Sequence, residues 1–208
     1  MKILFRNSRK YWESRYAGGG TSGAGSCGKW AEFKAEVLNS FVKGYGISSV
    51  IEFGCGDGNQ LSLANYPAYV GLDVSKTAIK RCKERFKHDK AKSFCLYTPD
   101  YFVDTNSTFT AQLALSLDVI YHLVEDRIFE LYMKHLFSSA EKFVIIYSTD
   151  SDVNYFFQFP HVKHRRFSEY VKINLPQWKL IRKIPNKYLS QSTKQTPTPA
   201  DFFIYEKL

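Results

Sequence analysis

Residues 50–58 read VIEFGCGDG, a short apolar run that leads directly into three glycines at alternate positions. Glycine accepts the positive φ angles of a sharp turn and lets the backbone approach a ligand closely. A second apolar run at 69–72 ends in Asp73, fifteen residues past the last glycine. An acidic residue at the end of a second strand is placed to bind a ribose. The stretch therefore predicts a strand, a turn and a ribose-containing ligand, and the alternative is a tight turn without a ligand.

Strand and helix patterns alternate through the middle of the chain. Residues 29–42 carry apolar side chains at steps of three and four, which predicts an amphipathic helix closed by Gly44. Ser75 is a predicted N-cap for the helix after Asp73. The other predicted elements are a short helix at 60–65, strands at 93–97, 111–117 and 142–147, and helices at 126–137 and 168–174. The alternation predicts an α/β fold, a parallel sheet with helices on both faces.

Length, composition and net charge limit the class of protein to which this chain can belong. The chain has 208 residues, 44% of them hydrophobic, which is enough for one domain with a sizeable core. No apolar run approaches the ~20 residues of a membrane span, and no signal peptide is recognisable. The four cysteines lack Cys-x-x-Cys spacing, which favours free thiols and a cytoplasmic location. The net charge of +9 favours anionic partners without selecting among them.

Three stretches carry a resemblance to a known family. Residues 52–58 have the spacing E-x-G-x-G-x-G, residues 70–73 read VGLD, and residues 116–123 read SLDVIYHL after the fourth strand. Together they resemble the class I S-adenosylmethionine-dependent methyltransferases over residues 49–148. The resemblance implies a Rossmann-like, doubly wound sheet of seven strands, mostly parallel, with a closing antiparallel hairpin at 178–184 and 201–207. It also implies a single methyltransferase domain over residues 1–208 and S-adenosylmethionine as the cofactor.

The resemblance assigns cofactor contacts at the ends of these strands. Glu52 would reach the ammonium group of the methionine portion, and Asp73 would accept hydrogen bonds from the ribose hydroxyls. Val74 would pack on the adenine, and Thr98 stands where many family members have an aspartate at the adenine edge. Further expected contacts are Gly54, Cys55 and Gly56 beside the methionine portion, and Ser116, Leu117 and Asp118 at its end. The aromatic rings of Tyr11, Tyr16 and Tyr121 are candidates to face the positive sulfonium.

Histidines and arginines are the candidates for acceptor chemistry. A hydroxyl acceptor needs a base, and His122 follows the fourth strand while His161 and His164 lie in a basic, aromatic stretch after the fifth. Arg165 and Arg166 would suit a phosphate or carboxylate on the acceptor. Residues 150–175 are therefore interpreted as an acceptor-side insertion, with an exposed basic loop as the alternative. The His pair lacks a matching carboxylate spacing, so no metal is expected.

The first 28 residues are interpreted as a lid. Aromatic and basic residues at 10–16 precede a glycine-rich run at 18–26 that has too many glycines for regular structure. The run would hinge while the aromatic part closes over the cofactor, ordered with ligand and disordered without it. The alternative is a flexible tether.

The preferred function is O-methylation of a small molecule or glycan, because no nucleic-acid-binding module is appended. The alternatives are an RNA or protein methyltransferase that uses the basic surface, and a binder of the cofactor without catalysis. The tetrapeptide expected of amino-methylating DNA enzymes is missing after the fourth strand, where residues 118–121 read DVIY. The methyl acceptor, the methylated atom and the oligomeric state are left open.

Overall fold

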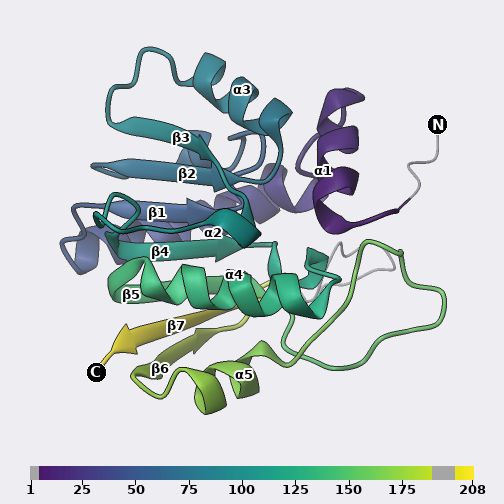
Figure 1. Cartoon of the computed structure of the whole chain (residues 1–208). Coiled ribbons are helices and arrows are strands. Elements are labelled where there is room, and N and C mark those ends of the chain that lie inside the picture. Colours follow the sequence, from purple (N-terminus) through teal and green to yellow (C-terminus); the bar gives the residue numbers. More distant parts are fainter. Residues whose placement is uncertain (1–4, 189–199) are drawn as a thin grey trace.

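The computed structural model describes residues 5–188 and 200–208 and is built on one seven-stranded sheet in the order β3-β2-β1-β4-β5-β7-β6 (Figure 1). β1 to β5 run parallel, and β7 is antiparallel to both β5 and β6. This confirms the predicted seven-stranded fold with its closing hairpin. The strands are β1 Val50–Phe53, β2 Tyr69–Asp73, β3 Lys92–Leu96, β4 Ala111–Leu117, β5 Ala140–Ser148, β6 Trp178–Ile184 and β7 Asp201–Lys207.

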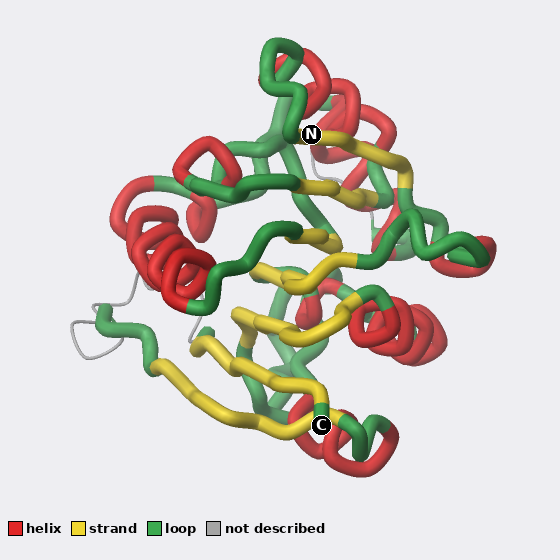
Figure 2. The backbone as a smooth tube through the Cα atoms, turned by 90° about the vertical axis from the view of Figure 1, so that its left-hand side faces the viewer, coloured by secondary structure: helices red, strands yellow, loops and turns green. Residues whose placement is uncertain are grey.

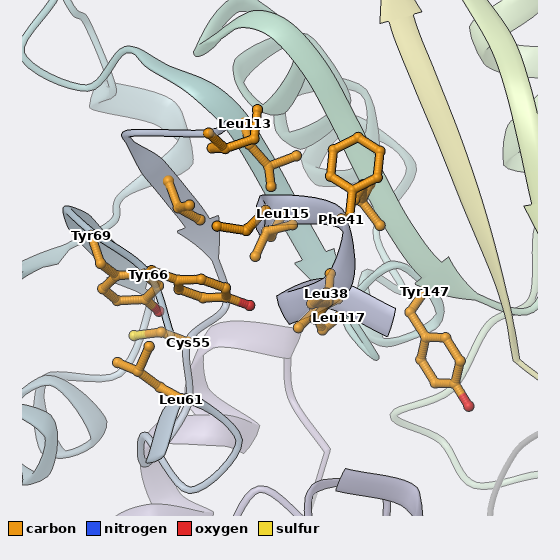
Figure 3. Packing of buried hydrophobic residues seen from close by; sticks show 14 of the residues in the cluster. Leu38, Phe41, Cys55, Leu61, Tyr66, Tyr69, Leu113, Leu115, Leu117 and Tyr147 are labelled. Atoms are coloured by element: carbon orange, nitrogen blue, oxygen red, sulfur yellow. The ribbon is translucent and has the colours of Figure 1, made fainter. Parts of the chain in front are cut away.

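Helices cover both faces of the sheet (Figure 2). Phe33, Leu38 and Phe41 of α2 pack with residues of β1, β4 and β5 in one core cluster, part of which, including Leu38, Phe41, Leu113 and Leu117, is drawn in Figure 3. Side chains of α4 and α5 form the core on the other face. Because both faces are covered, the central strands are apolar on both sides. The helices are α1 Ser8–Ala17, α2 Gly28–Gly44, α3 Lys76–Arg85, α4 Asp126–Ser138 and α5 Phe167–Asn174, with 3-10 turns η1 Ala24–Ser26, η2 Leu61–Leu63, η3 Pro99–Tyr101 and η4 Ile120–His122.

The strand order places the topological switch between β1 and β4. From β1 the chain goes outward through β2 and β3, then returns to β4 on the other side. The carboxyl ends of β1, β2 and β4 therefore meet at one edge of the sheet, which is where open α/β sheets bind ligands. The glycine turn, Asp73 and Asp118 all lie at this edge.

The N-terminal helix α1 is the element that the sequence did not predict. The side chain of Asn7 caps it by accepting from the backbone N–H of Lys10 at 2.8 Å, and the N–H of Gly18 closes it on Ser14. Its side chains form no apolar stripe, so periodicity gives no signal. After α1, residues 18–23 are irregular, as expected from their glycines.

Two further differences are small. The short helix predicted at 60–65 is a single 3-10 turn, η2, because Pro67 and the following strand leave no room for an α-helix. The predicted polar loop at 185–199 falls partly outside the described residues, which stop at 188 and resume at 200.

Candidate active site

A cavity of about 1030 Å³ opens at the carboxyl edge of β1, β2 and β4. Its wall combines the glycine turn, the ends of these strands, η3 and the inner side of α1. The volume is at the upper end of the range typical of small-ligand sites. The predicted site residues that line it are Tyr16, Glu52, Gly54, Cys55, Gly56, Asp73, Val74, Thr98, Leu117, Asp118 and His122.

Asp73 is bonded to the glycine turn across the cavity floor. Its Oδ2 accepts from the N–H of Gly56 at 2.9 Å and its Oδ1 from the N–H of Ser75 at 2.8 Å. Each carboxylate oxygen keeps a second lone pair for a ligand donor. Burial raises the pKa of Asp73 to about 6, although both backbone bonds favour the charged form. The chain thus holds a buried acceptor at the end of β2.

The first two glycines of the turn, Gly54 and Gly56, leave space that neighbouring side chains of the protein occupy. Gly54 and Gly56 have φ angles of 87° and 58°. A Cβ on Gly54 would collide with Val119, and one on Gly56 would collide with Ser22 Oγ. Glycine at these two positions therefore allows the segments that carry Val119 and Ser22 to approach the turn closely, as well as any ligand.

Glu52 lies beneath the turn at the end of β1. Its Oε2 accepts from the hydroxyl of Tyr69 at 2.7 Å. The side chain is buried, and burial raises the pKa of Glu52 to about 7 while the charge of Lys34 opposes the rise. A cationic ligand group beside it would favour the ionised form.

Asp118 directly follows β4 and has a φ of 59°, a conformation that aspartate tolerates better than most residues. Its Oδ2 accepts from Lys34 Nζ at 2.5 Å, and its Oδ1 accepts from the hydroxyl of Tyr121 at 2.9 Å. Lys34 comes from α2 and is only 1% exposed. A buried ion pair of Lys34 and Asp118 therefore lines the cavity.

The N-terminal segment is bonded to both sides of the cavity. On one side Ser8 Oγ donates to Glu125 at 2.6 Å. On the other, Glu13 accepts from the hydroxyls of Ser75 and Thr77 at 2.7 and 2.6 Å. The inner face of α1 thereby becomes a wall of the cavity.

The glycine-rich run after α1 lies directly on the glycine turn. Ser22 Oγ donates to Asp57 at 2.8 Å and lies 3.0 Å from the hydroxyl of Tyr16. Arg81 of α3 donates to the carbonyl oxygens of Gly20 and Tyr16 at 2.7 and 2.6 Å. These bonds hold the segment over the turn despite its glycine content.

His122 lines the cavity, and only one of its ring nitrogens is bonded among the described residues. Its Nδ1 lies 3.0 Å from the carbonyl oxygen of His161, which can only accept, so Nδ1 carries the proton and Nε2 the lone pair. Among the described residues Nε2 has no hydrogen-bond partner. Trp12 packs edge-on against the ring at 4.8 Å between centroids. Burial lowers the pKa of His122 to about 4, which keeps the imidazole neutral.

Other predicted site residues lie away from the cavity wall. Tyr11 stacks on His161 at 4.2 Å, and His164 bonds to Thr149 Oγ1 at 2.7 Å. Ser116 bonds to the hydroxyl of Tyr132. The predicted site residues that do not line the cavity are Tyr11, Ser116, Tyr121, His161, His164, Arg165 and Arg166.

The two arginines are engaged with protein groups. Arg165 donates to the carbonyl oxygens of Leu123 and Val124 at 2.5 and 2.8 Å and to Asp126 at 2.7 Å. Arg166 is exposed and lies 3.8 Å from Asp152. In this structure Arg165 fastens the loop after β5 to the loop after β4.

Sequence reasoning missed Lys34 and Gln60 as residues of the wall, and it included Trp12 and Ser22 only as parts of the lid. A signal existed for Lys34, because it shares the buried face of α2 with Leu38 and Phe41 at steps of four and three. A lysine at a core position is an unusual residue that points to a buried partner. Ser22 carried no such signal within its glycine-rich run.

Neither a metal centre nor a membrane span is found in the described part of the chain. Residues 5–188 and 200–208 gather no group of three or more His, Cys, Asp or Glu side chains that could hold a metal ion. None of the helices described there combines the length and apolar character needed to cross a bilayer. All four cysteines are free thiols.

No protein-family model and no curated protein matches this chain, but solved structures do. The N-methyltransferase NodS from Bradyrhizobium japonicum, crystallised with S-adenosylhomocysteine, is 14% identical over 97% of this chain and 98% of its own, with a TM-score of 0.71. Magnesium protoporphyrin IX methyltransferase from Synechocystis, with bound S-adenosylmethionine, is 14% identical over 100% of both chains, with a TM-score of 0.67. The methyltransferase domain of bacterial CtHen1 is 21% identical over 84% of this chain and 96% of its own, with a TM-score of 0.65. The chain therefore has the fold of the S-adenosylmethionine-dependent methyltransferases, as the three sequence stretches indicated.

Proposed function

We propose that this chain is an S-adenosylmethionine-dependent methyltransferase. The observation that carries the proposal is Asp73, a buried carboxylate at the end of β2 that is bonded to the glycine turn and opens on the cavity. Its free lone pairs suit the paired hydroxyls of a ribose. The fold shared with methyltransferases crystallised with this cofactor or its product adds support.

The cavity residues fit the cofactor along its length. Asp73 would hold the ribose, Val74 and Thr98 would contact the adenine, and Leu117 and Asp118 would line the methionine end. The ring of Tyr16 is available to the sulfonium. When bound, the cofactor supplies an electrophilic methyl group. What the chain contributes is orientation, exclusion of water and a base for the acceptor proton.

We assign the base role to His122. Its Nδ1 is fixed by the carbonyl oxygen of His161, so Nε2 is the atom that would accept a proton from an acceptor hydroxyl. His161 would then act through its backbone, and its ring would anchor Tyr11 of α1. His164, bonded to Thr149, is a weaker candidate because its ring lies away from the wall.

The acceptor that we favour is a small molecule or glycan hydroxyl. The loop after β5 carries two phenylalanines, Phe156 and Phe157, that are 95% and 94% exposed. Exposed aromatic faces suit the apolar face of a sugar or an aromatic ring. Three cationic residues, Arg6, Arg9 and Lys10, line the cavity rim and would suit an anionic group on the acceptor. They take the role that the sequence gave to Arg165 and Arg166.

The alternative acceptor is RNA or a protein, and the basic surface is what favours it. Binding through phosphates would fall steeply with salt, whereas binding of a small neutral acceptor would not. A turnover screen across sugars, phenols, carboxylic acids and RNA, read as S-adenosylhomocysteine formation at two salt concentrations, separates the alternatives. Methylation of RNA alone, with a steep salt dependence, would overturn our preferred acceptor. The cytoplasmic location suggested by the free cysteines stays a prediction.

We also propose that the N-terminal segment, residues 1–28, acts as a lid. The bonds of α1 to both sides of the cavity and of residues 20–22 to the glycine turn support a closed arrangement. Amide hydrogen exchange of residues 8–26 should slow when S-adenosylhomocysteine binds. Equal exchange in both states, with full activity after deletion of residues 1–26, would show that the segment is a tether.

A further inference from the structure

Gln60, the second residue after the glycine turn, carries a buried oxygen without a partner. The side chain is 9% exposed and lines the cavity. Its Nε2 donates to the carbonyl oxygen of Ala31 at 3.0 Å. Because a carbonyl oxygen can only accept, the amide nitrogen has to face Ala31 and Oε1 has to point elsewhere. Within the described residues Oε1 has no hydrogen-bond donor. A buried acceptor in this state destabilises the protein unless a ligand or water satisfies it.

The surroundings of Gln60 contain both signs of charge. Ala31, which Gln60 contacts, and Lys34 are one turn apart on α2, and the side chains of Gln60 and Lys34 both line the cavity. Lys34 Nζ uses one of its three N–H groups on Asp118 at 2.5 Å. The positive charge of Lys34 also acts to lower the pKa of Glu52. The cavity lining formed by Lys34, Gln60, Glu52 and Asp118 therefore offers one cationic donor and several acceptors, which is the chemistry that recognises a zwitterion.

We propose that Gln60 and Lys34 bind the amino-acid group of the cofactor. Gln60 Oε1 accepts a hydrogen bond from the α-ammonium group, and Lys34 Nζ donates to the α-carboxylate. The inference rests on the proposed function and adds to it, since the sequence assigned the ammonium to Glu52 alone. Glu52 Oε2 is already bonded to Tyr69, whereas Gln60 Oε1 is unpartnered among the described residues.

The test compares ligands with and without the amino-acid group. Calorimetry measures the affinity of the wild-type chain and of Gln60→Met for S-adenosylhomocysteine and for 5′-methylthioadenosine, which lacks that group. We expect Gln60→Met to weaken S-adenosylhomocysteine about tenfold, as for a lost bond to a charged group, and to leave methylthioadenosine unchanged. Gln112→Met is the matched control, because Gln112 accepts one backbone bond from Ser48 and does not line the cavity.

A third ligand separates the two residues. The analogue of S-adenosylhomocysteine without its α-carboxylate should still lose affinity in Gln60→Met but bind equally well to the wild type and to Lys34→Gln. Equal weakening of all three ligands in Gln60→Met, or no weakening of S-adenosylhomocysteine, would overturn the assignment while the proposed function stands. A folded wild-type chain that binds none of the ligands would overturn the proposed function as well.

Discussion

Replacing Gly56 by alanine should detach the N-terminal segment from the glycine turn. Gly56 has a φ of 58°, and a Cβ there would collide with Ser22 Oγ and lie 2.9 Å from the hydroxyl oxygen of Tyr16. Both groups belong to the segment that covers the turn. Ser22 cannot keep its bonds to Asp57 and also clear the new methyl group.

The magnitude follows from two separate costs. A left-handed conformation costs an alanine roughly 1–2 kcal/mol. Displacing Ser22 removes its 2.8 Å bond to the Asp57 carboxylate, and a hydrogen bond to a charged group contributes about 1.5–3 kcal/mol. We therefore expect Gly56→Ala to lower the free energy of unfolding by about 2.5–5 kcal/mol.

Gly46→Ala supplies the control. Gly46 has a φ of 62°, but a Cβ there meets nothing within 4 Å, so it carries the conformational cost alone. Urea denaturation gives the free energies of unfolding, and limited trypsin digestion at Arg15 reports release of the segment. Gly56→Ala should be cleaved much faster than both Gly46→Ala and the wild type. Equal cleavage and equal stability of the two alanine variants would refute the packing of Ser22 on the turn.

Three further predictions concern charged groups of the site. Under the proposed function ionised Asp73 would bind the ribose, so affinity for S-adenosylhomocysteine should fall as pH decreases through about 6. Asp73→Asn should bind about 1–3 kcal/mol more weakly at neutral pH without this dependence; a pH-independent affinity in the wild type would contradict the assignment. Burial lowers the pKa of His122 from 6.5 in the unfolded chain to about 4 in the folded protein, so protonation of His122 should reduce stability by about 3 kcal/mol as pH falls from 6.5 to 4. Denaturation of His122→Asn should show a shallower dependence on pH in this range, and an unchanged slope would count against burial of the neutral ring. Lys34→Met should lower the free energy of unfolding by about 3 kcal/mol, because Asp118 loses its ionic partner. The double variant Lys34→Met with Asp118→Asn should recover part of that loss in a double-mutant cycle. Additive effects of the two substitutions would show that the ion pair contributes no coupling energy.

The sequence was sufficient for the sheet and for the residues on its carboxyl edge. Strand β4 and the hairpin strands β6 and β7 have the predicted bounds. The buried strands β4 and β7 are recognisable as apolar runs between turn residues, whereas the largely exposed β6 was placed by the resemblance to the family. The positions of Asp73 and of the glycines could be predicted from spacing alone, because Asp73 is the last residue of β2 and Gly54 directly follows β1. Such positions depend on local sequence and strand order.

The features of the fold and the site that the sequence did not predict depend on contacts between residues far apart in the chain. Lys34 and Asp118 are 84 residues apart, so their ion pair could not be inferred from either segment. Helix α1 lacks an apolar stripe and gains its place from bonds such as Ser8 to Glu125. Arg165 was expected at the acceptor because it follows β5, but the sequence does not say in which direction a loop side chain points.

The most direct test of the central claim is a calorimetric titration of the wild-type chain with S-adenosylhomocysteine at neutral pH. We predict saturable binding of one molecule per chain, through the cavity that Asp73 and the glycine turn line. A chain that is folded by circular dichroism yet shows no saturable heat up to millimolar ligand would contradict the claim.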